Sequence, residues 1–213
     1  MKYGVPQGSV LGPIMFLLYT ADLLQLVRGH HLRPHAYADD LQIYSECRPA
    51  DVCLQDSMSA CVDDVACWMA ANRLQLNDAK SEVLWCSSTR RQHQIPRRAV
   101  RIGNTAVQPV SAVRHLGIML DAEVTMSKHV SAVVKASFAA LRRIRSVRRS
   151  VPRRALLTLI QALMVSKIDY CNSVLAGVSD TLLRRLQSVL NAAARLVFSA
   201  RSEHTTSLLR ELH

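Results

Sequence analysis

Ten residues, His35–Tyr44 (HAYADDLQIY), decide how this 213-residue chain is interpreted. Two adjacent carboxylates, Asp39 and Asp40, lie between short apolar stretches. The pattern predicts two strands around a tight turn, where aspartate tolerates unusual backbone angles. Adjacent carboxylates are costly unless a cation or solvent neutralises them, and oxygen ligands on a rigid hairpin suit Mg²⁺. The turn is therefore either a metal site for two-metal phosphoryl transfer or an ordinary polar hairpin turn.

The sequence on either side of this turn predicts a mixed α+β piece followed by a helical bundle. In the first part we expect helices at 14–27 and 50–72, strands at 82–86 and 114–121, and a ribbon over 97–113 turning at Gly103-Asn104. In the second part we expect helices at 127–149, 152–176 and 180–199, with a short one from Thr205. Leu156, Leu159, Ile160, Leu163 and Met164 are predicted to be core residues.

The net charge of +11 is distributed unevenly along the chain. Met1 to Glu123 holds twelve acids and twelve Lys or Arg residues, whereas Val124 to His213 holds four acids and fifteen bases. The whole positive excess therefore lies in the second part. Such asymmetry predicts a functional boundary near Glu123, with regions 1–123 and 124–213, and a polyanionic partner for the second region.

An acid-free stretch from Val124 to Ile168 predicts phosphate binding, although a solvated helix face is the alternative. A nucleic-acid duplex is recognised mostly by shape and backbone, which needs little base-edge chemistry. Four arginines flank a predicted helix–helix connection, where Arg148, Arg149, Arg153 and Arg154 are expected to converge. The residues that we expect to contact nucleic acid are Lys128, Lys135, Arg142, Arg143, Arg148, Arg149, Arg153 and Arg154.

The composition and the positions of proline and cysteine argue against a membrane protein, a signal peptide and a zinc-binding protein. The uncharged stretch from Tyr3 to Ala21 is interrupted by Pro6 and Pro13, so neither a membrane span nor a signal peptide is predicted. The six cysteines form no C-x-x-C pair and no histidine stands at a matching spacing, which argues against a zinc site. We expect them to be small buried hydrophobes of an intracellular protein, nuclear or cytoplasmic.

Four further stretches accompany the Tyr37-Ala38-Asp39-Asp40 turn. Together they resemble the reverse transcriptases of non-LTR retrotransposons, in the jockey-like or LINE group, over essentially the whole chain and in the family's order and spacings. The stretches are Gly4–Pro13 (GVPQGSVLGP), Phe16–Asp22 (FLLYTAD), Trp68–Leu84 (WMAANRLQLNDAKSEVL) and His115–Asp121 (HLGIMLD).

This resemblance implies a right-hand polymerase, with a partial palm at 1–123 and a thumb at 124–213. It implies Mg²⁺, or alternatively Mn²⁺, as cofactor, with an RNA template, a DNA primer and deoxynucleoside triphosphates as partners. Asp39 would be the principal metal ligand of the turn, with Asp40 beside it. Lys80 matches a palm lysine near the triphosphate, which protonates the leaving pyrophosphate; the alternative is a solvated lysine beside Glu82.

The resemblance also implies contacts to the nucleic acid. Leu116 and Gly117 match the primer grip, where a hairpin supports the primer end, and a strand with a bulge at Gly117 is compatible with that role. Glycine in the upstream loop lets the backbone approach a ligand closely. The residues that the resemblance places against nucleotide and template are Pro6, Gln7, Gly8, Ser9 and Tyr37.

The match also departs from the family pattern. The family's third metal carboxylate lies upstream of the Pro-Gln-Gly loop, where this sequence has only Met1, Lys2 and Tyr3, and Asp22 does not replace it. We therefore expect little or no primer extension by this chain alone. Three functions stay open: part of a reverse transcriptase, a non-catalytic nucleic-acid-binding module, or a retroelement remnant without function. The oligomeric state is open as well.

Overall fold

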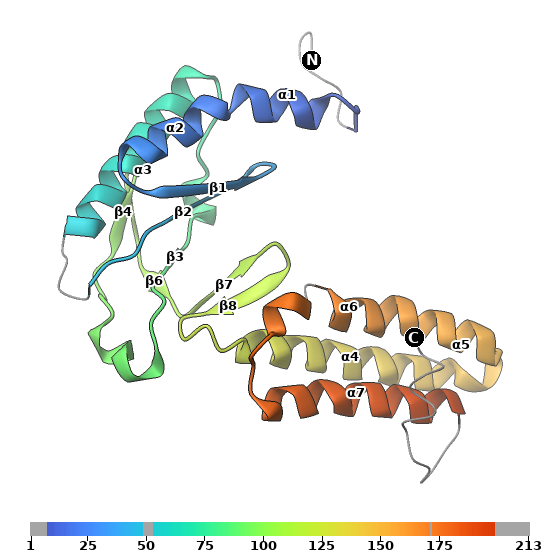
Figure 1. Ribbon diagram of the computed structural model, residues 1–213. Coiled ribbons are helices and arrows are strands. Elements are labelled where there is room, and N and C mark those ends of the chain that lie inside the picture. The colour runs from blue at the N-terminus through green and yellow to red at the C-terminus, as the bar shows by residue number, and fades with distance from the viewer. Residues whose placement is uncertain (1–7, 49–52, 171, 199–213) are drawn as a thin grey trace. The chain divides into compact units, whose positions relative to one another are not determined.

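The computed structural model describes residues 8–48, 53–170 and 172–198 (Figure 1). Through these residues the chain forms two compact units. One lies within Met1–Trp85 and Arg91–Val110, and the other within Cys86–Arg90 and Ser111–His213. Both units contain helices and strands, so the predicted α+β class is confirmed. The helix predicted from Thr205 lies outside the described residues.

The predicted helix at 14–27 is two helices, α1 (Gly12–Tyr19) and α2 (Ala21–Gly29). They are separated by Thr20, whose φ of −96° and ψ of 6° depart from helical values. Its Oγ1 donates a hydrogen bond to the Phe16 carbonyl oxygen at 2.9 Å. A threonine hydroxyl that bonds the preceding turn often bends a helix, which accounts for the break that apolar periodicity could not reveal.

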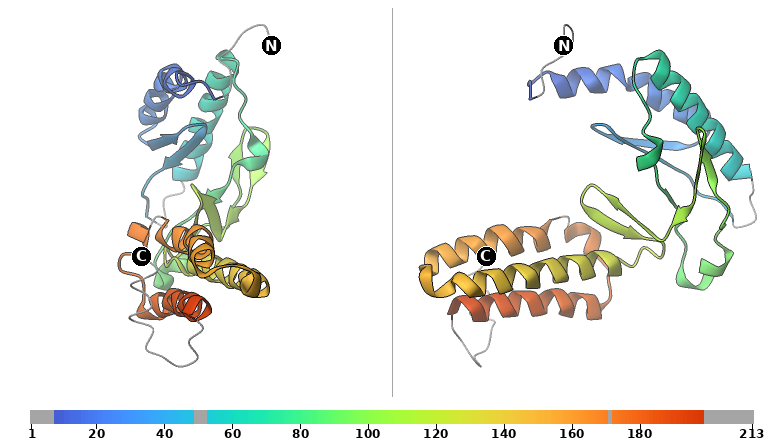
Figure 2. Two further views of the ribbon diagram at one scale, coloured as in Figure 1. Left: turned by 90° about the vertical axis from the view of Figure 1, so that its right-hand side faces the viewer. Right: turned by 180° about the vertical axis from the view of Figure 1, so that it is seen from behind.

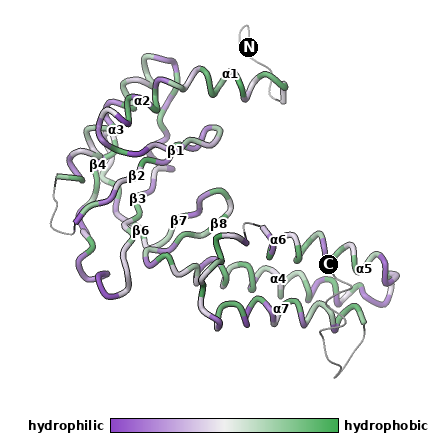
Figure 3. The backbone as a smooth tube through the Cα atoms, in the orientation of Figure 1, coloured by the Kyte–Doolittle hydropathy of each residue, from purple (hydrophilic) through white to green (hydrophobic). Residues whose placement is uncertain are grey.

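Helix α1 is apolar on all sides, as its mostly green tube shows (Figure 3). Its methionine, leucine and isoleucine side chains are each more than half exposed. The end of the helix is held by Tyr19, whose hydroxyl donates to the Asn72 carbonyl oxygen at 2.5 Å. The Tyr19 ring also meets Trp68 edge-on, with ring centroids 6.4 Å apart. Contiguous exposed apolar surface of this kind is typical of interaction sites.

The core of the first unit lies between α2 and α3 (Cys53–Ala71). The predicted helix at 50–72 is thus confirmed over its described residues, and the buried side chains are Leu23, Val27, Leu32, Cys61 and Val65. The hairpin of β1 (Arg33–Tyr37) and β2 (Asp40–Tyr44) packs on this core with Leu41 and Ile43. The hairpin was predicted to lie beside the helix that begins near Pro13. That predicted helix is two helices, and the second of them, α2, contacts β1.

The remaining strands of the first unit are short. Parallel strands β3 (Val83–Leu84) and β6 (Pro109–Val110) pair with each other. Antiparallel strands β4 (Val100–Ile102) and β5 (Thr105–Val107) turn at Gly103-Asn104, as predicted. Within the described residues every sheet has two strands. Two 3-10 turns, η1 (Asp78–Lys80) and η2 (Thr89–Gln94), lie in the connections.

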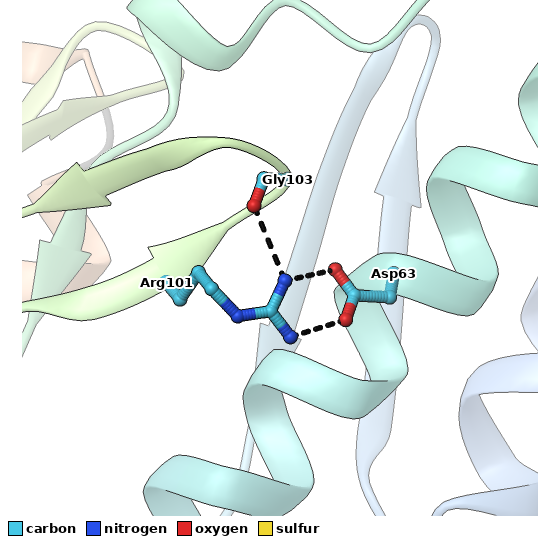
Figure 4. Close-up of polar contacts among 3 residues, drawn as sticks. All are labelled: Asp63, Arg101 and Gly103. Atoms are coloured by element: carbon cyan, nitrogen blue, oxygen red, sulfur yellow. Dashed lines mark hydrogen bonds and ion pairs between the residues drawn. The ribbon is translucent and has the colours of Figure 1, made fainter.

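An ion pair ties the β4–β5 hairpin to α3 (Figure 4). The Arg101 guanidinium donates to both carboxylate oxygens of Asp63, at 2.9 Å for Oδ1, and to the Gly103 carbonyl oxygen at 3.2 Å. The hydrogen bonds from Arg101 lower the pKa of Asp63, and its positive charge acts in the same direction. Because this folded-state pKa is depressed, the resulting stability is present above the unfolded pKa and is lost as the pH falls.

Replacing Arg101→Gln should lower the midpoint of thermal unfolding at pH 7. The difference from the parent should shrink below the ordinary aspartate pKa, because protonated Asp63 has already lost the pair there. Thermal unfolding monitored by circular dichroism at neutral and acidic pH measures this. The exposed Arg98→Gln is the matched control and should change little. An equal loss at both pH values would show that Arg101 acts through packing rather than charge.

The second unit begins with a hairpin that the residue pattern did not predict, although the primer-grip resemblance implies one. A single strand was expected at 114–121 after the ribbon at 97–113, but β7 (Ala112–His115) and β8 (Ile118–Asp121) pair antiparallel around Leu116-Gly117. That prediction was wrong because the apolar residues around this turn form one continuous pattern, which hides a two-residue loop. The hairpin itself agrees with the primer-grip resemblance in shape.

The rest of the second unit is a layer of helices that lie alongside one another (Figures 1 and 2). Its long helices are α4 (Ser127–Val147) and α7 (Asp180–Phe198), which pack together. Between them run α5 (Arg153–Ile160), the π-helical η4 (Gln161–Val165) and α6 (Ser166–Asp169). The predicted second helix thus ends at Asp169 rather than at 176, and 3-10 turns η3 (Arg148–Ser150) and η5 (Asn172–Leu175) complete the unit.

The π-helical segment changes which residues face the core. Ile160 and Met164 are fully buried, whereas Leu163, predicted as core, is 41% exposed. A π-bulge widens one turn of a helix, so the faces after it no longer follow the ideal 3.6-residue period. Leu156 is buried as predicted, and Leu159 packs against the same core.

We expect Ile160→Ala to destabilise the protein by about 2–5 kcal/mol, because it removes buried methylenes and leaves a cavity. Leu163→Ala removes a comparable side chain from a more exposed position and should cost much less. Urea unfolding of both variants distinguishes them. Equal losses would contradict the outward position of Leu163.

Two predictions from composition concern the cysteines and membranes. Cys61 is buried, and burial raises the pKa of its thiol to about 11. The other cysteines with described side chains are exposed, which contradicts the expectation of buried hydrophobes; they are Cys47, Cys53, Cys67 and Cys86. Cys67 is turned away because α3 buries the face of Cys61 and Val65. Among the described residues, no helix combines the length and apolar character needed to cross a bilayer.

Candidate functional site

The Asp39-Asp40 hairpin closes through a two-residue turn. The last strand pair is Tyr37 with Asp40, which leaves Ala38 and Asp39 as the turn residues. Two-residue hairpin loops need positive φ, and here Ala38 supplies it with φ of +52°. The sequence analysis expected aspartate to take the unusual angle, but alanine does so. A non-glycine residue in the left-handed region costs on the order of 1–3 kcal/mol, and such strain is concentrated at functional sites.

The two carboxylates at this turn stand open to solvent. Asp39 and Asp40 are both exposed, and in the described part of the chain neither carboxylate has a hydrogen-bond or ion-pair partner. Tyr37, opposite Asp40, is 61% exposed. Lys80 is also exposed, at the end of η1, and within the described residues it forms no ion pair with either aspartate. The structure therefore leaves the carboxylates available to an added cation.

The residues at the turn fit a metal that completes its shell with other ligands. In the regions that the structure describes, no group of three or more His, Cys, Asp or Glu side chains forms a closed metal cage. Mg²⁺ is usually bound through one or two carboxylates together with waters and substrate phosphates. Two exposed adjacent carboxylates match that requirement, whereas a structural zinc site would need four protein ligands.

The loop upstream of α1, which the resemblance places against nucleotide and template, lies only partly within the described residues. Pro6 and Gln7 lie outside the described residues. Gly8 has φ of +86°, which glycine adopts without a Cβ clash. Ser9 accepts a hydrogen bond through Oγ from the Gly12 backbone N–H at 3.2 Å, at the start of α1. The described part of the loop is therefore joined to a helix start by a side-chain bond.

The β7–β8 hairpin turns through Leu116 and Gly117, which have φ of +45° and +83°. Positive φ at both central residues is what a type I′ turn requires. Glycine takes this angle freely, whereas leucine takes it at a cost. The second candidate hairpin therefore also holds a strained non-glycine residue.

Contacts with α4 and with the residues just before it fix strand β8 of this hairpin. The buried Asp121 carboxylate accepts hydrogen bonds from the Thr125 N–H at 2.7 Å and from its hydroxyl. The buried His129 accepts the Met119 N–H through Nδ1 at 3.4 Å. Burial lowers the pKa of His129, which favours the neutral imidazole needed for an accepting nitrogen.

A groove of about 1210 Å³ runs over α4 and α7 in the second unit. Its arginines come from both helices and from η3, and its other side chains are mainly apolar. Among the described residues, no carboxylate lines it. The arginines are Arg142, Arg145, Arg148, Arg149 and Arg195, and the apolar residues are Phe138, Leu141, Ala192 and Leu196.

Comparison with known proteins gives the chain its family. A family model described as reverse transcriptase (RNA-dependent DNA polymerase) matches residues 1–120, more than half of the chain. The chain belongs to the reverse transcriptase family. The predicted resemblance to non-LTR retrotransposon reverse transcriptases is confirmed by this match and by the relatives described next.

The chain is similar to RNA-directed DNA polymerases of Drosophila mobile elements. It is 28% identical to the probable enzyme of the D. melanogaster transposon X-element, over 91% of this chain and 21% of that protein. It is 30% identical to the probable enzyme of D. melanogaster transposon BS, over 68% of this chain and 16% of that protein. The chain thus spans about a fifth or less of these relatives. No solved structure matches it.

In this reverse transcriptase chain, the structure gathers only some of the predicted basic residues. Of the four arginines expected to converge, Arg148 and Arg149 line the groove, whereas Arg153 stacks over the Phe198 ring at 4.3 Å. Lys128 donates through Nζ to the Ser111 hydroxyl at 2.7 Å. Arg142 also lines the groove; the predicted residues that do not line it are Lys128, Lys135, Arg143, Arg153 and Arg154.

Arg195 is the groove residue that sequence reasoning missed. It lies on α7, about fifty residues beyond the arginines of α4 and η3. Its charge is visible in the sequence, but only the packing of α7 against α4 brings it to the groove. A helical wheel shows which face of a helix is polar and does not show which neighbouring helix that face adjoins.

We expect Ala38→Val to lower the free energy of unfolding by about 1 kcal/mol, because a β-branched side chain raises the cost of positive φ. Ala38→Gly should not lower it comparably, since glycine relieves the strain while gaining entropy in the unfolded chain. Urea unfolding of both variants measures the difference. Equal stability of the two variants would contradict the left-handed angle at Ala38.

Proposed function

We propose that this chain is part of an RNA-directed DNA polymerase and supplies its metal turn and a duplex-holding helical region. The observation that carries the proposal is the pair of exposed carboxylates, Asp39 and Asp40, on a strained turn. Neither has a protein partner in the described residues. Strain and unpaired charge both lower stability, and a bound cation offsets the second cost. The family match supports the same assignment.

Asp39 and Asp40 hold Mg²⁺, or Mn²⁺, in this proposal. The bound metal supplies charge neutralisation at the triphosphate and activates the primer hydroxyl. The substrates are an RNA template, a DNA primer and deoxynucleoside triphosphates, inside the nucleus or cytoplasm. Tyr37, exposed opposite Asp40, contacts the nucleotide together with the loop residues Pro6, Gln7, Gly8 and Ser9. Lys80 acts at the triphosphate when substrate is bound, as a proton donor to pyrophosphate.

By function we assign 1–123 to a palm and 124–213 to a thumb. The compact units divide earlier, between Val110 and Ser111. The β7–β8 hairpin is therefore a palm element in this assignment, although it is built on α4 through Asp121 and His129. A hairpin fixed to the thumb helices suits a primer grip, because one rigid piece then holds the primer strand.

The arginine groove binds the phosphate backbone of the template–primer duplex. No carboxylate is among the described residues that line the groove, and guanidinium groups pair well with phosphate oxygens. Lys135 and Arg143 are exposed on α4 and Arg154 is exposed on α5, and in this proposal they make further phosphate contacts outside the groove. Counterion release from phosphate contacts makes such binding steeply dependent on salt.

The polymerase proposal is tested with a chimera in which this chain replaces the matching stretch of the X-element relative. The chimera should extend a DNA primer on an RNA template with Mg²⁺. Asp39→Asn should reduce extension at least about 100-fold, since a direct metal ligand matters at least as much as the groups that orient it.

The matched control is Asp56→Asn, an exposed aspartate of α3 away from the turn, which should leave extension unchanged. Duplex binding by the chimera, measured without metal, shows that it is folded. A chimera that binds duplex and extends no primer would contradict the proposal. Equal extension by the Asp39 and Asp56 variants would contradict the metal turn.

The groove is tested by the double variant Arg142→Gln, Arg145→Gln in the chain itself. Each lost phosphate contact lowers the magnitude of the salt slope by about one, so a change of about two is expected. The control removes the same charge outside the groove, through Lys167→Gln and Arg184→Gln, which are both exposed. Duplex affinity measured against salt concentration compares them. Identical slopes for both variants would show that the groove is only a solvated surface.

The second candidate function is a nucleic-acid-binding module without catalysis, and the arginine groove favours it. The two functions give different results in these two assays. A module without catalysis would show the groove-dependent salt slope but no extension that depends on Asp39. A functionless remnant would show neither.

A further inference from the structure

Tyr170, the residue after α6, contacts the turn of the β7–β8 hairpin within the second unit. Its hydroxyl donates a hydrogen bond to the Leu116 carbonyl oxygen at 2.7 Å, between residues 54 positions apart. Its own N–H bonds the Ser166 carbonyl oxygen at 3.1 Å, so the ring is carried by the end of a helix. A helix end therefore supports a strained turn through a side-chain hydrogen bond.

The ring of Tyr170 also explains why position 117 is glycine. A Cβ added to Gly117 would lie 3.1 Å from Tyr170 Cε1, which is tighter than ordinary van der Waals contact, and 3.6 Å from its hydroxyl oxygen. Gly117 also needs positive φ, at +83°. Two separate constraints, backbone angle and contact with the ring, therefore favour the smallest residue here.

The contact between Tyr170 and the Leu116-Gly117 turn is suited to fixing the position of the turn rather than to stabilising the hydrophobic core. Tyr170 is 51% exposed, and Gly117 is exposed as well. The base of the hairpin is already fixed by Asp121 and His129. Without Tyr170, the strained Leu116 would lose its hydrogen-bonded support at the tip, where the family resemblance puts the primer end.

We propose that Tyr170 is a positioning residue of the primer grip, which holds the Leu116-Gly117 turn in the conformation that supports the primer 3′ end. This inference rests on the proposed polymerase function. The hydroxyl bond fixes the Leu116 carbonyl, and the ring limits movement of Gly117.

The test uses the same chimera with Tyr170→Phe, which keeps the ring and removes the hydroxyl. Primer extension at saturating duplex and nucleotide should slow by about two- to tenfold, the range expected for one lost hydrogen bond. The duplex concentration giving half-maximal rate should change less than twofold. Tyr44→Phe, an exposed tyrosine of β2, is the control and should extend primers like the parent.

A purely structural role predicts a different result. Loss of stability would lower the unfolding midpoint and leave the rate of the folded enzyme at saturation unchanged, so both quantities are measured. A second comparison uses Gly117→Ala, whose effect on rate should be smaller in a Tyr170→Ala background because the contact with the ring is gone. Such non-additivity reports direct coupling between the two positions.

The outcomes separate the two proposals. If the unmodified chimera extends no primer, the polymerase function fails and the role of Tyr170 fails with it. If it extends primers and Tyr170→Phe has the parental rate, only the assignment of Tyr170 is overturned. A slower rate at unchanged half-maximal duplex concentration, with non-additive Gly117 and Tyr170 effects, supports it.

Discussion

A two-residue loop between antiparallel strands requires a positive backbone φ, and this constraint shapes both candidate functional hairpins. In each hairpin a non-glycine residue takes the left-handed angle, Ala38 at +52° and Leu116 at +45°. Each such residue costs free energy that surrounding contacts must offset. The cost at Ala38 is offset by the packing of its hairpin on α2 and α3. The cost at Leu116 is offset by the hydrogen bonds that Met119 donates to His129 of α4 and that Tyr170 donates to Leu116.

The two hairpins present different chemistry to solvent. The first ends in two carboxylates that lack protein partners in the described residues, which favours a cation and its phosphate ligands. The second ends in a turn that Tyr170 contacts through the Leu116 carbonyl oxygen and through Gly117, so it presents backbone and an aromatic ring rather than charge. Charge follows the same division, since the positive excess lies after Glu123 and five arginines line one groove there. In the proposed function, metal binding and phosphate binding are therefore carried by separate parts of the chain.

Sequence patterns predicted the elements whose signal is local. The Tyr37-Ala38-Asp39-Asp40 hairpin, the turn at Gly103-Asn104 and the starts of the long helices after residue 126 follow from turn residues and helical spacing. The same patterns could not reveal the break at Thr20, because threonine also occurs within continuous helices. Its hydroxyl bond to the Phe16 carbonyl oxygen is seen only in the structure.

The features that sequence reasoning missed depend on packing between distant segments. The turn at Leu116 uses an apolar residue where turn-forming residues are expected, and Tyr170, 54 positions away, supports it. Arg195 lines the groove only because α7 packs on α4. Arg153 lies outside the expected cluster and stacks on the Phe198 ring. Leu163 faces outward because a π-helical turn shifts the register of its helix.

Metal binding by Asp39 and Asp40 is measured directly by titrating the isotopically labelled chain with Mn²⁺ and observing paramagnetic broadening of the backbone amide signals. We expect broadening that is concentrated at Ala38, Asp39 and Asp40 and is lost in the double variant Asp39→Asn, Asp40→Asn. Amides of the turn that stay sharp at millimolar Mn²⁺, or broadening that is unchanged in the double variant, would contradict it.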